Sequence, residues 1–189
     1  MDKRFVPGWL IITALFSACS ASTERKLGEH VFDIPKANDI AERDRPFFLP
    51  PSNPRDGFSF ILNPAGSLPN QNLIAVASKE QMCARAEGTQ ARINATICAV
   101  PVISWRGIPL RKVSDGGLWT YNLPTEAHGR PMAALVSCFA MADGDGQGLC
   151  TAPLPHDDLV ITIHLRDDQI ASLASLYDQA VTKLQHWER

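Results

Sequence analysis

Alternation of apolar and polar positions predicts several short β-strands in this chain. The clearest case is residues 158–165, where every second residue from Leu159 to Leu165 is leucine or isoleucine. This two-residue period is typical of a strand with one buried face. Further strand candidates lie at residues 30–36, 57–62, 73–77, 97–105, 118–123 and 132–141, and residues 79–86 either continue a strand or form one helical turn.

The last part of the chain changes to the period of a helix. Asp167 or Asp168 can cap this helix, and cationic side chains near its far end complement the helix dipole. Several short strands followed by one amphipathic helix predict an α+β domain, in which a mostly antiparallel β-sheet carries the C-terminal helix on one face. The apolar residues at helical spacing are Ile170, Leu173, Tyr177, Ala180, Val181, Leu184 and Trp187.

Two stretches between these elements are expected to be connecting segments. Residues 37–56 are rich in proline and charge, which is typical of a long surface loop. Residues 106–117 form a polar connector that separates Trp105 from Trp119.

The N-terminus has the layout of a secretory signal. Lys3 and Arg4 precede an apolar run at residues 5–16, which is too short to span a bilayer comfortably as a helix. Small residues then lead into Cys19, and this resembles the lipobox of bacterial lipoproteins, in which the cysteine becomes the lipidated first residue of the mature chain.

The lipobox resemblance implies that residues 1–18 are removed as a signal peptide and that Cys19 carries a lipid anchor. Ser20 follows, and in such lipoproteins a serine there implies the outer membrane, with the protein facing the periplasm. We expect the polar residues 19–27 to form a tether and residues 28–189 to form a single domain. Ordinary signal cleavage after Ser20 is the alternative.

The remaining cysteines predict two disulfide bonds. Four cysteines are left when Cys19 is set aside, and an even number in an oxidising compartment is typical of a disulfide framework. Four cysteines allow three pairings; the simplest joins sequence neighbours, so that each bond closes a loop short enough to be one β-hairpin. These pairs are Cys83 with Cys98 and Cys138 with Cys150. The spacing does not suit zinc, because there is no Cys-x-x-Cys and no nearby histidine pair.

Charge and motifs narrow the possible functions. The chain has 18 basic and 20 acidic residues and a formal net charge of −2, which argues against nucleic acid as the main partner. It has no Gly-x-Ser-x-Gly motif, no phosphate-binding loop and no dinucleotide fingerprint. The acidic glycine loop at 143–148 resembles the start of a calcium loop, but the position that needs a bidentate carboxylate is Leu154. We therefore expect a protein that is not an enzyme and uses no cofactor or metal.

Two groups of residues are candidates for contact with a partner protein. The acidic loop would be held at its base by a disulfide, and a preorganised acidic loop suits a basic surface. The second group surrounds two tryptophans, since tryptophan and arginine most often anchor interfaces, although burial in the core is the alternative for both tryptophans. The candidates are Asp143, Asp145 and Gln147 in the loop, and Trp105, Arg106, Arg111 and Trp119 in the second group.

Three parts of the chain together resemble a known family. They are FDIPK at residues 32–36, a proline-rich loop followed by GFSFILNP at residues 57–64, and an ending of Cys150, an alternating strand and a helix at 170–187. This pattern is similar to lipoproteins that act as immunity proteins against type VI secretion lipase effectors. The resemblance implies a lipid-anchored periplasmic protein that forms a heterodimer with a cognate phospholipase effector and blocks its active site or membrane engagement.

Two other functions fit the same features. One is an envelope structural or assembly lipoprotein that binds other envelope components, and the other is a small periplasmic hydrolase with an unrecognised site. An immunity protein forms a tight one-to-one complex with a lipase, whereas an assembly protein has many weak partners. A hydrolase loses activity when a buried polar cluster is substituted.

Overall fold

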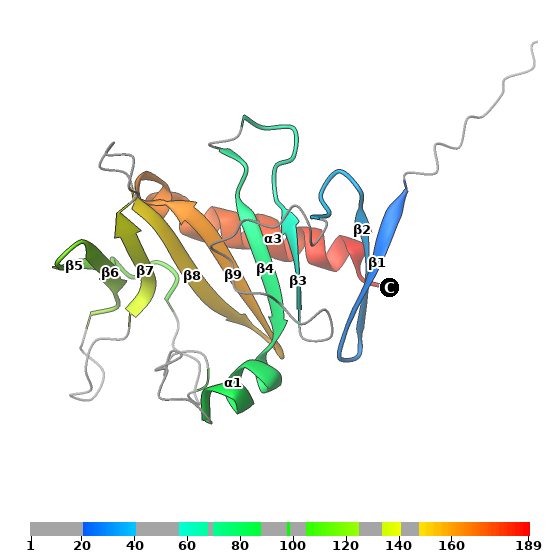
Figure 1. Cartoon of the computed structure of the whole chain (residues 1–189), viewed down its shortest axis with the longest axis horizontal. Coiled ribbons are helices and arrows are strands. Elements are labelled where there is room, and N and C mark those ends of the chain that lie inside the picture. Colours follow the sequence, from blue (N-terminus) through cyan, green and yellow to red (C-terminus); the bar gives the residue numbers. More distant parts are fainter. Residues whose placement is uncertain are drawn as a thin grey trace, which may run out of the picture.

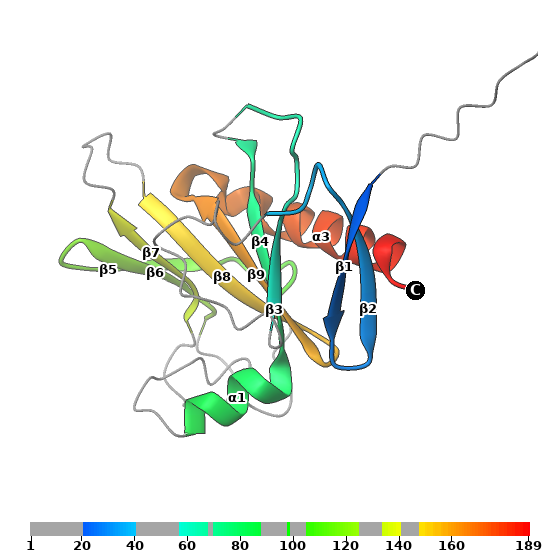
Figure 2. The ribbon, with the colours of Figure 1, turned by 45° about the vertical axis from the view of Figure 1, so that its right-hand side comes forward.

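The computed structural model of the chain describes residues 21–40, 57–67, 70–87, 98, 105–124, 134–140 and 148–189. In these ranges the strands form a two-stranded and a seven-stranded sheet, and helix α3 crosses one face of the larger sheet (Figure 1, Figure 2). The predicted antiparallel α+β fold with a C-terminal helix on one face is confirmed. The strands are β1 (Ser22–Leu27), β2 (His30–Pro35), β3 (Gly57–Ile61), β4 (Leu73–Ser78), β5 (Arg111–Asp115), β6 (Leu118–Asn122), β7 (Ala134–Ala140), β8 (Gly148–His156) and β9 (Leu159–Arg166). The helices are α1 (Lys79–Glu87), the 3-10 helix η3 (Asp167–Ser172) and α3 (Leu173–Trp187).

The larger sheet has the strand order β3-β4-β9-β8-β7-β6-β5, and every neighbouring pair is antiparallel. β9, which has the clearest alternation in the sequence, lies inside the sheet between β4 and β8. Its residues Ile161, Ile163 and Leu165 are buried in the same core as α3, whereas Thr162 and His164 lie on the opposite face and are partly exposed. The apolar residues that alternate along β9 therefore point to the face of the sheet that α3 covers.

The core lies between the larger sheet and α3. Phe60 of β3 and Trp187 at the end of α3 meet edge to face, with ring centroids 5.0 Å apart. This contact holds the last turn of the helix against the edge of the sheet. The helix buries Leu173, Leu176, Tyr177, Ala180, Leu184 and Trp187. Among the described residues, no helix has the length and apolar character needed to cross a membrane.

The hairpin of β1 and β2 corrects the expected tether at residues 19–27, because residues 22–27 pair with β2 along its length. Phe32 and Ile34 of β2 are buried, but in β1 only Leu27 is buried. A strand that buries a single side chain shows no apolar alternation. Its sequence therefore looks like that of a polar linker.

His30, at the start of β2, joins this hairpin to two distant parts of the chain. Its Nδ1 lies 2.6 Å from Oε1 of Glu188, just after α3, and its Nε2 lies 2.9 Å from Oδ1 of Asp158, in the turn between β8 and β9. The hydrogen bond to Glu188 raises the pKa of His30, and Asp158 adds to the rise, while partial burial acts against it. The protonated ring can donate to both carboxylates, so His30 in this form connects three segments that are far apart in the sequence.

Replacing His30 with glutamine is expected to lower the free energy of unfolding by about 1 kcal/mol at about pH 6 and by much less at about pH 9. Because the pKa of His30 is raised in the folded state, its contribution is complete below the unfolded-state pKa and is lost as the pH rises through the folded-state pKa. Urea unfolding at the two pH values measures this, with His186→Gln, at an exposed position on α3, as the control. An equal loss at both pH values would show that His30 stabilises the fold in some other way.

The disulfide connectivity predicted from sequence neighbours is present: Cys83 is bonded to Cys98 and Cys138 to Cys150. Only the second bond closes a hairpin, in which Cys138 of β7 lies opposite Cys150 of β8. Cys83 lies in α1, so the expected hairpin around the first bond is wrong and the helical alternative for this stretch is correct. The reason is local, since α1 consists largely of good helix formers and follows Ser78, whose Oγ accepts a hydrogen bond from a backbone amide in the first turn of the helix.

Two further strands differ from the sequence prediction. β5 lies inside the expected connector at residues 106–117, where the exposed side chains of residues 111–114 produce no alternation. β8 continues to its end through Pro153 and Pro155, although proline interrupts pairing in most strands. Here β7 pairs with β8 only as far as Ser137 opposite Thr151. The prolines lie beyond this point, and their backbone nitrogens face the side of β8 that β7 no longer covers. The missing N–H groups therefore cost no hydrogen bond to β7.

Candidate partner-binding site

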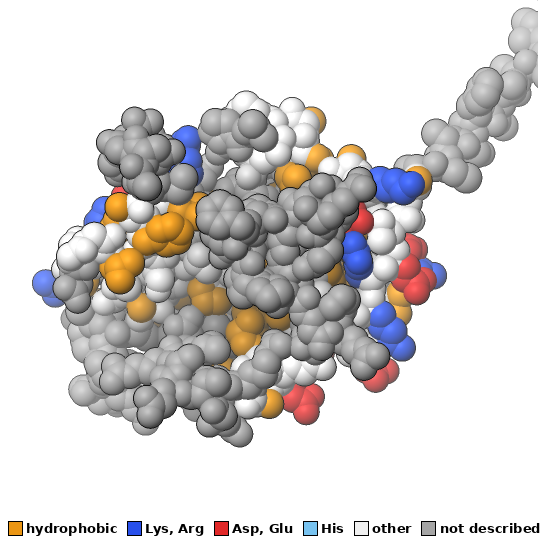
Figure 3. Space-filling model, in the orientation of Figure 1, with side chains coloured by type: hydrophobic (Ala, Val, Ile, Leu, Met, Phe, Trp, Pro, Cys, Tyr) orange, Lys and Arg blue, Asp and Glu red, His pale blue; other side chains and the backbone are white. Residues whose placement is uncertain are grey.

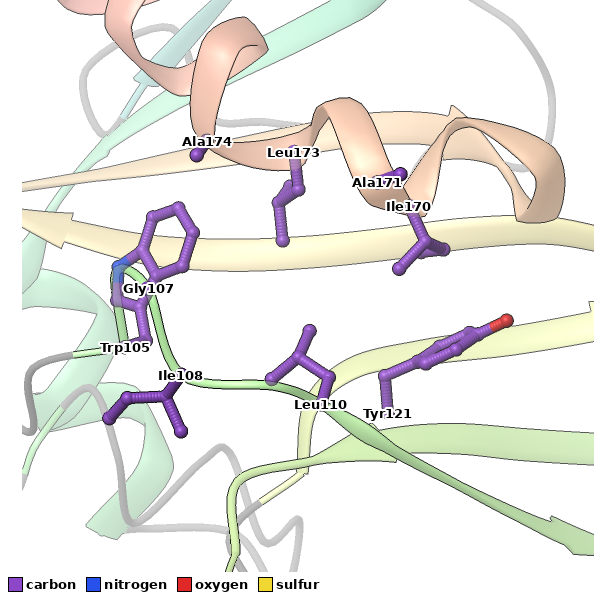
Figure 4. A pocket seen from close by; sticks show the side chains of 9 residues that line it. All are labelled: Trp105, Gly107, Ile108, Leu110, Tyr121, Ile170, Ala171, Leu173 and Ala174. Atoms are coloured by element: carbon purple, nitrogen blue, oxygen red, sulfur yellow. The ribbon is translucent and has the colours of Figure 1, made fainter.

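A pocket of about 340 Å³ opens between the start of α3 and the segment that leads into β5. Residues from these two distant parts of the chain face each other across it, and the hydroxyl of Tyr121 points away from the space between them (Figure 4). The walls are therefore mostly apolar. They consist of Trp105, Gly107, Ile108, Leu110 and Tyr121 on one side and of Ile170, Ala171, Leu173 and Ala174 on the other.

One end of the pocket is held by contacts around Tyr177 of α3. The ring of Trp105 meets the Tyr177 ring edge to face at a centroid distance of 5.7 Å, and the guanidinium carbon of Arg106 lies 5.1 Å from the same ring. Arg106 also forms an ion pair with Asp178, and the hydroxyl of Tyr177 donates a hydrogen bond of 2.9 Å to the carbonyl of Pro155. Burial raises the pKa of Tyr177, so this hydroxyl stays a neutral donor. These contacts fix Trp105 and Arg106 against the helix.

The other end is held by Asp167, the first residue of η3. Its Oδ1 accepts hydrogen bonds from Nε1 of Trp119 and from the hydroxyl of Tyr121, both at 2.7 Å. Its Oδ2 accepts a hydrogen bond of 2.9 Å from Nζ of Lys112, and this Nζ lies 4.7 Å from the centroid of the Trp119 ring. One carboxylate thus ties β5 and β6 to the start of the helical segment.

The charges of this cluster follow from its contacts. Burial alone would raise the pKa of Asp167, but the hydrogen bonds from Tyr121, Lys112 and Trp119 together outweigh it and lower that pKa. The hydrogen bond to Asp167 raises the pKa of Lys112, and burial raises the pKa of Tyr121. At neutral pH the cluster therefore contains a carboxylate, an ammonium group and a neutral phenol.

The structure separates the contact residues predicted from the sequence. Trp105 and Arg106 lie together at one end of the pocket, where Trp105 is partly buried and Arg106 is exposed. Trp119 is partly buried at the other end, and Arg111 is exposed at the start of β5. The loop candidates Asp143, Asp145 and Gln147 lie outside the described residues.

Helix capping by Asp167 or Asp168 is not what the structure shows. Asp167 accepts hydrogen bonds from β5 and β6, and Asp168 pairs with Arg166. The residue before α3 is Ser172, and its side chain makes no capping hydrogen bond. The capping prediction is wrong because both carboxylates bind other side chains. Donors from distant strands bind Asp167, although its position in the sequence favours a bond to the first turn of the helix. Sequence patterns contain no indication of this long-range contact.

Cys138, Cys150 and Asp167 lie close enough together to resemble a metal site. The two sulfur atoms are bonded to each other, however, so they offer no thiolate to a metal. The carboxylate oxygens already accept hydrogen bonds from three side chains. This cluster accordingly supports the end of the pocket through covalent and hydrogen bonds.

Comparison with known proteins does not assign the chain to a family. No protein-family model matches it, and no curated protein matches its sequence. Among solved structures it is similar to Smlt3025, an immunity protein of the Stenotrophomonas maltophilia type IV secretion system, with a TM-score of 0.45 and 10% identity over 90% of this chain and 94% of that chain.

Proposed function

We propose that this chain is an immunity protein that binds a phospholipase effector of a type VI secretion system and covers its active site or its membrane-engaging surface. The observation that carries the proposal is the apolar pocket between Trp105 and Tyr121, with Arg106 exposed beside it. An apolar pocket with an aromatic and an arginine at its rim suits one apolar anchor side chain of a partner protein.

The pocket is preorganised for such a contact. Tyr177 and Asp178 hold one end and Asp167 holds the other, so the rim has little freedom to lose on binding. Binding to a rigid rim is favoured because less conformational entropy is lost. Burying a leucine or phenylalanine side chain in the pocket contributes about 1.5–3 kcal/mol.

A phospholipase is a chemically suitable partner for this pocket. Its active site receives acyl chains, so the surface around that site carries exposed apolar side chains. An inhibitor that binds one of these side chains covers the surface that must meet the membrane. Such an inhibitor acts by forming a stable complex and does not need to catalyse a reaction.

We also propose that a lipid on Cys19 holds the protein at the periplasmic side of the outer membrane. The two disulfides support an oxidising compartment. Replacement Cys19→Ser is expected to move the protein from the membrane fraction to the soluble fraction of lysed cells, because the lipid acceptor is lost. Unchanged membrane association would contradict the anchor and leave the pocket proposal intact.

The binding proposal is tested by mixing the purified chain with the product of a lipase gene next to its own. A stable one-to-one complex is expected in size-exclusion chromatography with light scattering. Arg106→Glu should weaken the complex at least about tenfold, whereas Lys26→Glu, at an exposed position in β1, should not. Failure of two folded proteins to form a complex would contradict the immunity function and favour the envelope-assembly alternative.

A further inference from the structure

β5 is the outermost strand of the seven-stranded sheet, and within the described ranges no strand pairs with its free side. Figure 1 and Figure 2 both show it at the end of the sheet farthest from β1 and β2. Residues 111–114 are all exposed. An edge of this kind offers backbone N–H and C=O groups to another strand.

The neighbouring strand shows which backbone groups point to this edge. The amide of Ala140 in β7 donates a hydrogen bond of 3.2 Å to the carbonyl of Gly117, just before β6. Backbone groups alternate in direction along a strand, so the N–H and C=O groups of odd-numbered residues in β6 bond to β7 and those of even-numbered residues bond to β5. Val113 lies opposite Thr120 and therefore bonds towards β6. It follows that the N–H and C=O groups of the residues before and after Val113 point to the free edge.

The sequence of β5 is complementary to itself when it is reversed. Val113 is its central residue, with Arg111 two positions before it and Asp115 two positions after it. In an antiparallel pair of β5 strands centred on Val113, Arg111 of each copy lies opposite Asp115 of the other, and opposite charges in such positions stabilise strand pairing. Within the described part of the chain, Arg111 has no ion-pair partner of its own.

An apolar patch lies beside this edge on the face of the sheet opposite α3. It consists of Leu118, Phe139 and Val113, whose exposed fractions are 62%, 40% and 36%. Leu118 lies opposite Phe139 in the register of β6 and β7, and the alternation of the strands places Val113 on the same face. Figure 3 looks onto this face and shows hydrophobic side chains gathered at the same end of the molecule. Among the described residues, the large apolar side chains with the highest exposure therefore lie on or beside the unpaired strand β5.

We propose that two copies of this chain associate through β5, antiparallel about Val113, and join their larger sheets into one continuous sheet. Lys112 and Ser114 of each copy then exchange backbone hydrogen bonds with the other copy. Val113 meets its counterpart at a non-hydrogen-bonded position, where side chains of paired strands approach most closely. The two-fold axis makes both halves of the contact identical and brings the two apolar patches onto one surface. Because the pocket lies on the face that carries α3, this association does not depend on effector binding.

The contact is small, and its strength is limited accordingly. Two five-residue strands bury less than about 1,200 Å² in total, which is the range of weak and transient interfaces. We expect a reversible dimer with a dissociation constant on the order of 100 µM. Sedimentation equilibrium of the purified chain at increasing concentration measures this constant.

Charge reversal tests the register. Arg111→Glu and Asp115→Arg are each expected to weaken the dimer at least about tenfold, because like charges then lie opposite each other. An equimolar mixture of the two variants is expected to recover association, since each variant then meets complementary charges. A wild-type chain that stays monomeric to about 1 mM, or a mixture no stronger than either variant alone, would overturn the proposal.

Two further variants test the geometry. Val113→Cys should form an intermolecular disulfide on mild oxidation, whereas Ser137→Cys, exposed on β7 and away from the axis, should not. Ser114→Pro removes an edge-facing N–H without breaking the pairing of β5 with β6, and it should abolish the dimer while the melting temperature stays close to that of the wild type. Equal cross-linking at positions 113 and 137, or a dimer that survives Ser114→Pro, would overturn the proposed pairing.

Discussion

Replacing Asp167 with alanine is expected to lower the free energy of unfolding by about 3 kcal/mol. The change removes the acceptor of the Trp119 indole, the Tyr121 hydroxyl and the Lys112 ammonium group. The two aromatic donors are partly buried, so they lose a charged partner without full access to water. Urea unfolding of the wild type and the variant measures the difference.

The neighbouring residue provides a matched control for this substitution. Asp168 is also acidic and lies in η3, but its side chain is 50% exposed and pairs with Arg166 at the surface. Asp168→Ala should therefore cost less than about 1 kcal/mol. Similar losses for the two variants would contradict the role assigned to Asp167.

Asp167→Asn separates the charge from the hydrogen bonds. The amide oxygen still accepts hydrogen bonds, so an intermediate loss of stability is expected near neutral pH. Because the pKa of Asp167 is lowered in the folded state, its charge stabilises the fold above the unfolded-state pKa, and this stabilisation is lost as the pH falls through the folded-state pKa. The difference in free energy of unfolding between the wild type and Asp167→Asn should shrink over that acidic range. A difference that does not change with pH would show that the charge of Asp167 does not stabilise the fold.

Ala174→Phe is expected to weaken effector binding by about 100-fold, which corresponds to about 2.7 kcal/mol. Ala174 lines the pocket from α3 and is exposed, so a phenylalanine can occupy the pocket without disturbing the core. A filled pocket cannot receive an anchor side chain from the partner. Isothermal titration calorimetry with the cognate lipase measures the change in affinity.

Gln185→Phe is the control for this experiment. Gln185 is an exposed residue of the same helix and does not line the pocket, so the variant adds an equal apolar surface elsewhere. It should bind the effector like the wild type. If both phenylalanine variants bind normally, the interface lies outside the pocket.

The apolar pattern predicts most of the strands that bury one face. β8 is the exception, because it also buries alternate residues but contains two prolines, which are rare inside strands. β2, β3, β4, β6, β7 and β9 lie within about two residues of the predicted ranges, and the helical period predicts α3. The pattern misses β1 and β5 for the same physical reason. Each lies at an edge and buries at most one side chain, so its register depends on pairing with a neighbour and not on burial.

The candidate site is only partly accessible from the sequence. Trp105 and Arg106 can be selected because their residue types suit interfaces, and the structure places them together beside the pocket. The pocket itself needs residues 105–110 and 170–174 to meet in space, which no local pattern indicates. The role of Asp167 is hidden for the same reason, because its partners lie about fifty residues earlier in the chain.

Lipase activity of the cognate effector, titrated with this chain, tests the central claim most directly. We predict that activity falls in proportion to added chain and ends near one equivalent, that Gln185→Phe inhibits like the wild type, and that Ala174→Phe leaves most of the activity. A lipase that keeps its full activity in the presence of excess folded chain would contradict the immunity function.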